Sequence, residues 1–329
     1  MKATDILRGL KKYVTGYYRY GQGIEGMNAW AFVADGLWCR VRYGCVFNQF
    51  TEGGFHRYRA YQRRRILTYR HWKRIIKANS PADIHYFQNK AHFNTFFHRF
   101  IGRDWLQSAE MTEEQFAAFA ERHAEAIVKP LDDWEGNGIR IEKITPPSAD
   151  NSRFIELFAA LRAQNVLIEE VVVQHPQMVF GNRSVNTIRA YTVYDASERK
   201  AHLISTTLRA GVGESVVDNS HSGGLAYEVD ITTGRIDSLG WSHTRTGVMF
   251  HPGADICMLG RAIPHWDAVT DMVKRAAEMM PSVPYVGWDV AILPDGPILI
   301  EGNHDPDLDI MEFVGHSGHL PLILSHLKH

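Results

Sequence analysis

Strict alternation of apolar and polar residues is clearest near the C-terminal end of the chain. Two such runs, 285–293 and 297–303, are separated by the tripeptide Pro294-Asp295-Gly296. Alternation is typical of β-strands, and a three-residue loop ending in Gly suits a type I turn followed by a left-handed residue. The pattern therefore predicts a β-hairpin.

The side chains of this hairpin separate into a polar face and an apolar face. In the predicted register Leu293 faces Pro297. Asp289 then faces Glu301, and Asn303 lies on the same face as Glu301 because side chains alternate along a strand. We expect the other face to lie in the core, since it carries Trp288, Val290, Ile292, Ile298 and Ile300.

The polar face is a candidate metal site. Two carboxylates opposed across a hairpin repel each other, and a cation between them removes that repulsion. Asp289, Glu301 and Asn303 offer only oxygen ligands, which suits Mg²⁺ rather than zinc, and Mg²⁺ commonly takes further ligands from phosphates and water. Gly287 and Ala291 leave space beside them for a bulky ligand. The alternative is a solvent-facing strand face with unrelated charges.

Along the rest of the chain, strand-like and helix-like apolar periodicities alternate. They predict an α+β fold with antiparallel sheets, because most strands come in hairpins with helices between them. A domain boundary is predicted near residue 88, after a basic, largely helical N-terminal region. The predicted helices are 1–20, 57–78, 83–100, 113–123 (with a Thr112–Gln115 capping box), 151–161 and 267–280. The other predicted strands are 126–129, 139–144, 166–173, 186–194, 200–208, 225–230 and 235–239.

Composition excludes several classes of protein. The chain has 329 residues, of which 45% are hydrophobic, enough for a substantial core in one or two domains. Three cysteines give no disulfide framework, so we expect a reducing compartment and a cytoplasmic location. No signal peptide is evident, and no apolar run approaches the roughly 20 residues that span a bilayer. Despite 17 histidines, HExxH, GxSxG and Walker motifs are absent, which argues against zinc hydrolysis.

Charge is distributed unevenly along the chain. The first 88 residues contain 16 Lys and Arg against 5 Asp and Glu, whereas the remainder contains 20 against 32. The basic excess peaks between Arg57 and Arg74, with Arg63-Arg64-Arg65 at its centre. Such a segment attracts an anionic polymer, a membrane surface or a phosphorylated substrate. The alternative is a solvated helix whose arginines pair with the acidic remainder.

Two lysines and a glycine-containing loop are candidate phosphate contacts. Lys129 ends an apolar strand, which fixes its charge in space, and Lys90 opens an aromatic-rich helix. Gly136 and Gly138 follow Lys129, and glycines let backbone N–H groups approach phosphate oxygens closely. Each of these features is common when it occurs alone.

Four further charged residues lie in predicted strands or at their ends. Glu169 and Glu170 interrupt an apolar strand, and buried carboxylates need partners. One possibility is the amino group and ribose hydroxyls of an adenine nucleotide, and the alternative is an edge strand with one solvent-facing acid. Arg189 and Arg209 suit bidentate binding of phosphate or carboxylate, with a salt bridge as the alternative for each.

In their order and spacing, these segments resemble the ATP-grasp superfamily, and most closely its sugar-transfer-associated branch. The resemblance covers roughly residues 85–315. The matching segments are Asn89-Lys90, Ile127-Val128-Lys129-Pro130 with Gly136 and Gly138, Gln174-His175-Pro176, Ser184-Val185-Asn186-Thr187-Ile188-Arg189, Asp218-Asn219 with Gly223-Gly224, Gly287-Trp288-Asp289, and Glu301-Gly302-Asn303. One departure is Gly287, because many ligases of the superfamily carry an arginine two residues before the metal aspartate.

The resemblance implies an ATP-grasp domain at 89–329, in which two α+β subdomains with antiparallel sheets grip ATP. The lid subdomain is expected at about 110–175 and the metal-binding, catalytic subdomain at about 176–329. By resemblance, the residues that contact ATP are Lys90, Lys129, Gly136, Gly138, Glu169, Glu170 and Val172. By the same resemblance, Mg²⁺ is bound by Asp289, Glu301 and Asn303, and the transferred phosphate meets Arg189, with Arg209 as the other candidate.

The implied activity is ATP-dependent ligation of a small-molecule carboxylate to an amine, or less often a thiol, through an acyl phosphate. The expected substrate is derived from a sugar or an amino acid. One alternative is phosphoryl transfer to a sugar or other small acceptor without ligation. Another is a nucleotide-regulated binding module whose basic N-terminal region docks on an anionic polymer or a membrane surface.

Overall fold

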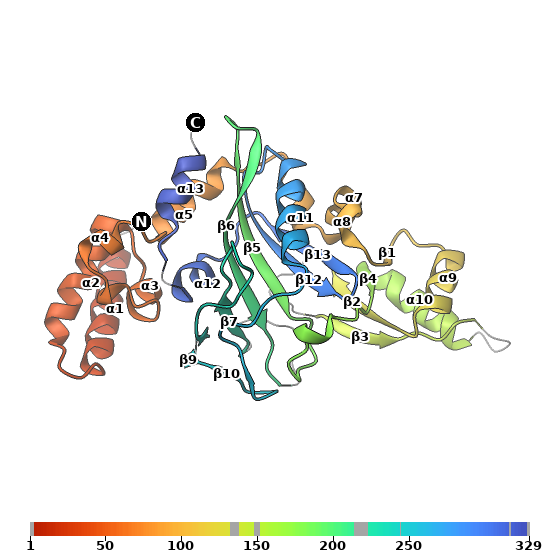
Figure 1. Ribbon diagram of the computed structural model, residues 1–329, viewed down its shortest axis with the longest axis horizontal. Coiled ribbons are helices and arrows are strands. Elements are labelled where there is room, and N and C mark those ends of the chain that lie inside the picture. The colour runs from red at the N-terminus through yellow and green to blue at the C-terminus, as the bar shows by residue number, and fades with distance from the viewer. Residues whose placement is uncertain are drawn as a thin grey trace.

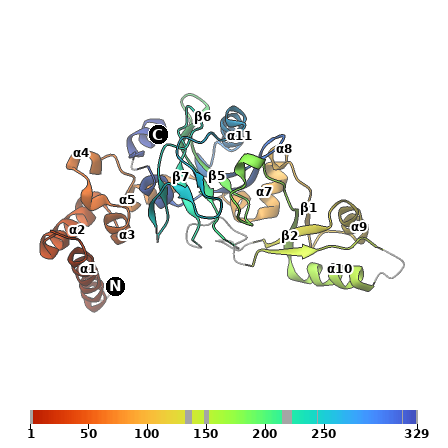
Figure 2. The same cartoon turned by 60° about the horizontal axis from the view of Figure 1, so that its bottom comes forward.

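The computed structural model describes residues 3–131, 138–147, 152–213, 223–243, 245–315 and 317–327. A helical N-terminal region, a large sheet and a small sheet follow one another across the molecule, and two views agree on this order (Figures 1 and 2). The described strands pair antiparallel and helices pack against both sheets, which confirms the predicted α+β fold. None of the helices in these ranges combines the length and the apolar character needed to cross a bilayer.

The N-terminal region consists of helices packed around aromatic side chains, including Tyr17, Phe32 and Phe50. The first helix is confirmed, but 57–78 is not the single helix predicted. The helix is interrupted because the side chain of Gln49 binds the carbonyl of Leu67 and the N–H of Tyr69 in place of helical partners. The elements here are α1 (Ala3–Gln22), α2 (Ala29–Tyr43), α3 (Phe47–Thr51), α4 (Ala60–Arg63) and α5 (Tyr69–Ile75), with 3₁₀ turns at Phe55–Arg57 and Ile76–Ala78.

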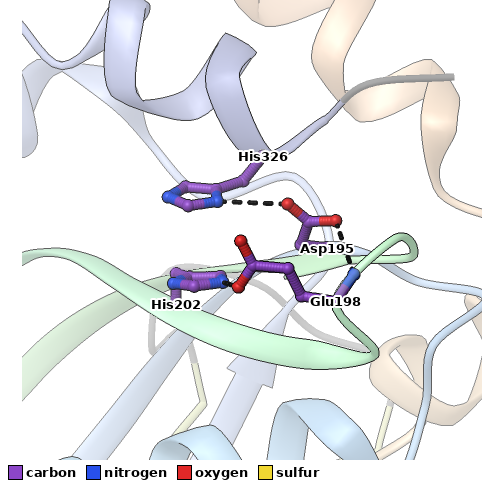
Figure 3. A group of neighbouring side chains, drawn as sticks. All are labelled: Asp195, Glu198, His202 and His326. Carbon is purple, nitrogen blue, oxygen red and sulfur yellow. Dashed lines mark hydrogen bonds and ion pairs between the residues drawn. The ribbon is translucent and has the colours of Figure 1, made fainter.

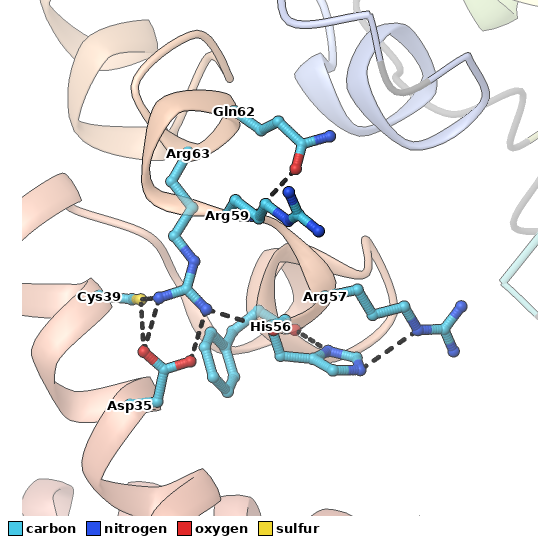
Figure 4. Close-up of polar contacts among 8 residues, drawn as sticks. Asp35, Cys39, His56, Arg57, Arg59, Gln62 and Arg63 are labelled. Atoms are coloured by element: carbon cyan, nitrogen blue, oxygen red, sulfur yellow. Dashed lines mark hydrogen bonds and ion pairs between the residues drawn. The ribbon is translucent and has the colours of Figure 1, made fainter.

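Arg63, one of the three arginines at the centre of the basic segment, is neutralised inside the N-terminal region. Arg63 donates two hydrogen bonds of 2.6 Å to the carboxylate of Asp35, and a third to the sulfur of Cys39 at 3.2 Å (Figure 4). The prediction that this arginine pairs with the acidic remainder of the chain is therefore wrong. Arg64 and Arg65 are exposed and carry the charge of this segment outward.

A cluster of short aromatic helices connects this region to the small sheet. These helices are α6 (His85–Gln88), α7 (Lys90–Phe96) and α8 (His98–Ile101). The small sheet has the strand order β1-β4-β2-β3. Its strands are β1 (Trp105–Gln107), β2 (Glu125–Pro130), β3 (Arg140–Lys143) and β4 (Val166–Glu170). Its helices are α9 (Glu113–Arg122) and α10 (Ser152–Gln164).

Two predictions in the small sheet have clear outcomes. The Thr112 capping box is confirmed, because Gln115 N–H donates to the Thr112 hydroxyl at 3.2 Å and Thr112 N–H donates to the Gln115 side chain at 2.9 Å. The strand predicted at 166–173 ends at Glu170. Strand β4 stops there because its partners β1 and β2 provide no further pairing.

The large sheet has the strand order β13-β12-β5-β6-β7-β8-β9, and β10 pairs with β11 separately. The strand predicted at 235–239 is wrong, because Arg235 and Ile236 make only isolated bridges. The strands are β5 (Thr187–Asp195), β6 (Lys200–Ala210), β7 (Leu225–Glu228), β8 (Gly240–Trp241), β9 (Thr246–Val248), β10 (Phe250–His251), β11 (Ile256–Cys257), β12 (Tyr285–Leu293) and β13 (Gly296–Asn303).

The two faces of the large sheet bury different clusters. One face carries Ile188, Leu208 and Trp288 and packs against α11 (Trp266–Glu278) and the aromatic helices. The opposite face carries Tyr191 and Val193 and packs against α5, α12 (Leu308–Phe313) and α13 (Leu320–His326). The second face also bears the polar side chains of the candidate site. The domain boundary near residue 88 stays a prediction.

Candidate functional site

The turn of the C-terminal hairpin is one residue shorter than predicted. Leu293 pairs with Gly296, so the loop contains only Pro294 and Asp295, and the predicted pairing of Leu293 with Pro297 is wrong. Gly296 has a φ of 143°, a region of backbone space that is essentially restricted to glycine. A residue with a Cβ in this place would strain the turn.

A β-bulge restores the functional pairing. Ile300 is an extra residue on β13, and beyond it Asp289 pairs with Glu301 as predicted. Residues of β13 between the turn and the bulge therefore point to the opposite face from the one predicted. Leu299, rather than Ile298, therefore lies in the core cluster, and the prediction for Ile298 is wrong. Ile300 itself is only partly buried, rather than being a core residue.

Asp289 lies between two arginines supplied by neighbouring strands. Strand pairing places Arg189 directly opposite Asp289, and its guanidinium binds both carboxylate oxygens, through Nε to Oδ1 and through Nη2 to Oδ2 at 2.9 Å. Arg209, from β6, donates to Oδ2 at 2.9 Å. Burial alone would raise the pKa of Asp289, but Arg189 and Arg209 outweigh it and hold this pKa at about 2.

Glu301 and Asn303 complete the polar face. Burial, and then the negative charge of Asp289, raise the pKa of the Glu301 carboxyl, which shares a hydrogen bond with Asp289. Asn303 pairs with Gly287 across the hairpin. Its side-chain nitrogen is buried and makes no hydrogen bond within the described part of the chain. Asp289, Glu301 and Asn303 therefore stand together on one face, with one amide group left unsatisfied.

The space predicted beside Gly287 is filled by protein. A Cβ at this position would lie 2.6 Å from the Cβ of Pro306 and 3.3 Å from the Cδ of Arg189. Ala291 is fully buried as well. The prediction that these small residues leave room for a bulky ligand is therefore wrong. Gly287 instead lets the Arg189 stem pass close to β12 and reach Asp289.

A second buried carboxylate lies in the small sheet. Glu169 is 1% exposed, and its Oε2 lies 2.6 Å from the Lys129 ammonium. Its Oε1 accepts hydrogen bonds from Arg103 at 2.6 and 3.0 Å and from Asn94 at 3.0 Å. Burial alone would raise the pKa of Glu169, but Arg103 and Lys129 together lower it. Each oxygen of Glu169 is thus bound by protein groups.

The two carboxylate sites are physically connected. Arg103 also donates to the carbonyls of Leu299, at 2.6 Å, and Ile300, at 3.2 Å, beside the bulge of β13. The charge of Lys129 also acts on Glu301, whose pKa it lowers. Arg103 therefore links Glu169 of the small sheet to strand β13 of the hairpin, and Lys129 lies close enough to Glu301 to influence its charge.

Lys90, another predicted nucleotide contact, lies close to the end of strand β2. Lys90 is the first residue of α7, and its ammonium lies 3.5 Å from the carbonyl of Leu131, just after β2. Asn89 caps this helix by accepting from two backbone N–H groups at 3.0 and 3.1 Å. Lys90 and Lys129 thus both lie near the C-terminal end of β2.

The remaining predicted contacts have varied surroundings. Glu170 accepts a hydrogen bond from the N–H of Asp104 at 3.0 Å, and Val172 is partly buried in the segment after β4. Gly138 has a φ of 71°, which favours glycine. The residues predicted for the site that lie outside the described ranges are Gly136, Asp218 and Asn219.

Arg103 and Asn94 belong to this arrangement but were not identified from the sequence. Arg103 is 66 residues from Glu169 and 196 residues from Leu299, so no local pattern connects them. A weak signal existed, because a strand acid inside an apolar run requires a cation, and Arg103 is a charged residue between an aromatic helix and a strand.

Comparisons with known proteins show the family to which the chain belongs. The model of the family described as sugar-transfer-associated ATP-grasp matches residues 75–328. No curated protein matches the chain. Similar solved structures include the ATP-grasp ligase PsnB with minimal precursor, Mg and ADP (15% identity, TM-score 0.45, 77% of this chain and 62% of that one). Another is D-alanyl-alanine synthetase A from Vibrio cholerae (10% identity, TM-score 0.41, 76% and 63%). This chain thus spans less than two thirds of each of these structures.

Proposed function

Because the chain belongs to the sugar-transfer-associated ATP-grasp family, we propose that it is an ATP-dependent ligase, which joins a carboxylate to an amine, or less often a thiol, through an acyl phosphate. One observation carries the proposal. Asp289, Glu301 and Asn303 present oxygen ligands on one face of the β12–β13 hairpin, where Arg189 and Arg209 bind Asp289 and the charge of Lys129 acts on Glu301. Such a face suits a metal-bound triphosphate.

The residues fit Mg²⁺ by the chemistry of their donor atoms. Two carboxylates and one amide supply oxygen alone, and the unsatisfied Asn303 amide can rotate to present its oxygen. When bound, Mg²⁺ neutralises phosphate charge. Burial and the charge of Asp289 raise the pKa of Glu301, and a bound Mg²⁺ would favour its ionised form, because metal ligands must be deprotonated.

The arginines have separable roles in this proposal. Arg189 is 7% exposed and binds both oxygens of Asp289, so we assign it to positioning the metal carboxylate. Arg209 contacts Asp289 through Nη1, and we assign it to the transferred phosphate. A fixed guanidinium stabilises charge that develops on phosphate oxygens during transfer.

The nucleotide is proposed to lie between the two sheets. Lys90 and Lys129 contact its phosphates, together with the loop containing Gly136 and Gly138. Glu169 holds the Lys129 ammonium in place at 2.6 Å rather than binding the base itself. Glu170 and Val172 follow on the same strand and its extension, where backbone groups recognise the purine edge. The acceptor and donor are small molecules derived from a sugar or an amino acid.

Glu301→Gln tests the metal assignment, with Asp295→Asn as the matched control in the exposed turn of the same hairpin. Binding of an ATP analogue is measured by calorimetry with and without Mg²⁺, and ADP release is measured with candidate acids and amines. We expect Glu301→Gln to lose Mg²⁺-dependent binding and at least about 100-fold of turnover, because a metal ligand is missing. Unchanged Mg²⁺ dependence in Glu301→Gln would rule out the metal site.

Mass spectrometry of the product distinguishes the proposed ligase from a kinase. An amide or thioester formed together with ADP supports ligation. A phosphorylated acceptor with no amide would show phosphoryl transfer instead. ATP binding with neither product, under all substrates tried, would favour a nucleotide-regulated binding module.

Contact of the segment Arg57–Arg74 with an anionic polymer or membrane surface is also proposed. Arg63 is a poor probe, because its removal leaves Asp35 without a partner. Reversing the charge of exposed Arg64 and Arg65 is expected to weaken salt-sensitive binding to anionic vesicles or polymers severalfold. Binding that is unaffected by this double change and by salt would exclude the segment as a docking site.

A further inference from the structure

Four metal-binding side chains meet far from the Asp289 hairpin, at the end of the β5–β6 ribbon. Asp195 ends β5, Glu198 lies in the turn, and His202 lies on β6. His326 reaches the same place from α13, the last helix (Figure 3). One donor atom from each of the four lies within 4.8 Å of every other.

The turn holds the Asp195 carboxylate in a fixed orientation. Its Oδ1 accepts from the N–H of Ser197 at 2.8 Å, from the Ser197 hydroxyl at 2.6 Å and from the N–H of Glu198 at 3.2 Å. The other oxygen, Oδ2, is thereby directed to His326 Nδ1 at 3.3 Å. Hydrogen bonds that orient a ligand oxygen in this way are typical of built metal sites.

The two imidazole rings lie face to face. The centroids of His202 and His326 are 3.7 Å apart and their planes differ by 12°. His202 Nε2 is 3.0 Å from Glu198 Oε2, yet it is buried and has no hydrogen bond of acceptable geometry within the described ranges. Two stacked imidazolium rings would repel each other, whereas two neutral rings can share one cation.

We propose that Asp195, Glu198, His202 and His326 bind one divalent transition-metal ion, with zinc the best match. Two imidazole nitrogens and two carboxylate oxygens suit tetrahedral zinc and are a poor set for Mg²⁺. Zinc bonds of about 2.0–2.2 Å place the donor atoms about 3.3–3.6 Å apart. Binding would draw the donor atoms in from the 4.8 Å limit and tilt the stacked rings toward the ion, because an imidazole lone pair lies in the plane of its ring; Glu198 has 52% of its side chain exposed and can move most.

Such an ion would fasten the last helix to the sheet. His326 is on α13, which packs on β5 and β6 through Leu320 and Ile323. These strands also carry Arg189 and Arg209, so the ion would support the framework behind the nucleotide site without touching it. We therefore assign the ion a structural role, separate from the all-oxygen site at Asp289.

The test is zinc titration of the full chain, stripped of metal with a chelator and kept free of nucleotide. We expect one equivalent of Zn²⁺ to bind and to raise the melting temperature. His202→Ala and His326→Ala should each weaken binding by more than about 100-fold, since even outer-shell changes cost 10–100-fold. The matched control is His98→Ala, an exposed histidine whose ring bonds only the carbonyl of Thr95 among the described residues.

Two further measurements keep the test decisive. Glu198→Gln changes an exposed turn residue without threatening the fold, and it should weaken zinc binding as well. Co²⁺ should give the visible absorption of a tetrahedral site in the native chain and lose it in the histidine variants. The proposal is overturned if no stoichiometric Zn²⁺ binds or if the variants bind it like His98→Ala. It is also overturned if only His123→Ala removes zinc, since His123 lies with Asp104 and Glu170 in the other described cluster.

Discussion

Glu169 in the small sheet and Asp289 in the large sheet are built alike but differ in their surroundings. Each is a buried carboxylate held between two cations, Arg103 and Lys129 for one and Arg189 and Arg209 for the other. In both, the cations lower the pKa of the acid against the effect of burial. Local charge pairing is therefore the same in the two places.

The difference lies in what surrounds each pair. Around Glu169 the hydrogen-bonding groups have protein partners. Asn94 donates a further hydrogen bond to Glu169, and Arg103 also donates to three backbone carbonyls. Around Asp289 a second carboxyl, Glu301, stands opposite, and the nearby Asn303 amide is unsatisfied. A closed buried network stabilises the fold, whereas an incomplete one is typical of a place where a ligand is missing.

The first prediction tests whether Glu169 stabilises the fold. Glu169→Gln leaves Arg103 and Lys129 buried without a counter-charge, so we expect the free energy of unfolding to fall by about 3–5 kcal/mol. Chemical denaturation measures it, with exposed Glu125→Gln on β2 as the control. A loss below about 1 kcal/mol would show that the network contributes little.

The same residue predicts an acid dependence. The folded pKa of Glu169 is lowered, so its contribution is fully present above its unfolded value of about 4.3 and is lost as pH falls through the folded pKa. Glu169→Gln should therefore show a shallower loss of stability below about pH 4 than the native chain. Parallel curves would contradict the lowered pKa.

These two sites also show how far the sequence alone could lead. The alternating pattern identified the hairpin, because opposite faces of a strand must differ when one is buried. The predicted pairing of Asp289 with Glu301 is correct because two errors cancel. The turn is one residue shorter than predicted, and the bulge at Ile300 adds one residue to β13, so the register beyond the bulge is the one that a three-residue loop would give. The bulge leaves no mark in the pattern, and the face of Ile298 was therefore misassigned.

Contacts between residues far apart in the chain could not be predicted from the sequence, for a different reason. Residues 57–78 have helical periodicity, but Gln49 and Glu312 bind the backbone at Leu67 and interrupt the helix. Arg103 reaches Glu169 only after the helices and the small sheet have come together. Such partners are set by tertiary packing, which local propensity does not encode.

The second prediction concerns Asp289→Asn, which should remove turnover but cost less stability than Glu169→Gln. The charge of Asp289 raises the pKa of Glu301, so its removal favours the ionised form of Glu301, which can then serve as the partner of Arg189. We expect a loss of about 2 kcal/mol in unfolding free energy, because the buried arginines keep a partner. Equal losses in the two variants would contradict the contrast between the closed and the incomplete site. In the double variant Asp289→Asn with Glu301→Gln, Arg189 should lose this replacement partner, and the loss of stability should be larger.

The third prediction has the smallest expected effect and concerns Asp309, in the first turn of α12. It tests how burial alters the pKa of a carboxyl group when no cation offsets it. Burial, followed by the charges of Asp307 and Glu52, raises the pKa of Asp309 to about 8. Its contribution to stability is therefore fully present below the unfolded value of about 3.9 and is lost as pH rises toward 8. Asp309→Asn should lose less stability than the native chain as pH rises from 4 to above 8, and the two should be nearly equal at pH 4, because the amide has no charge to bury. If Asp309→Asn and the native chain were equally stable at both pH values, Asp309 would be ionised in the folded protein. Burial without a neighbouring cation would then not give Asp309 a different charge state from Glu169 and Asp289.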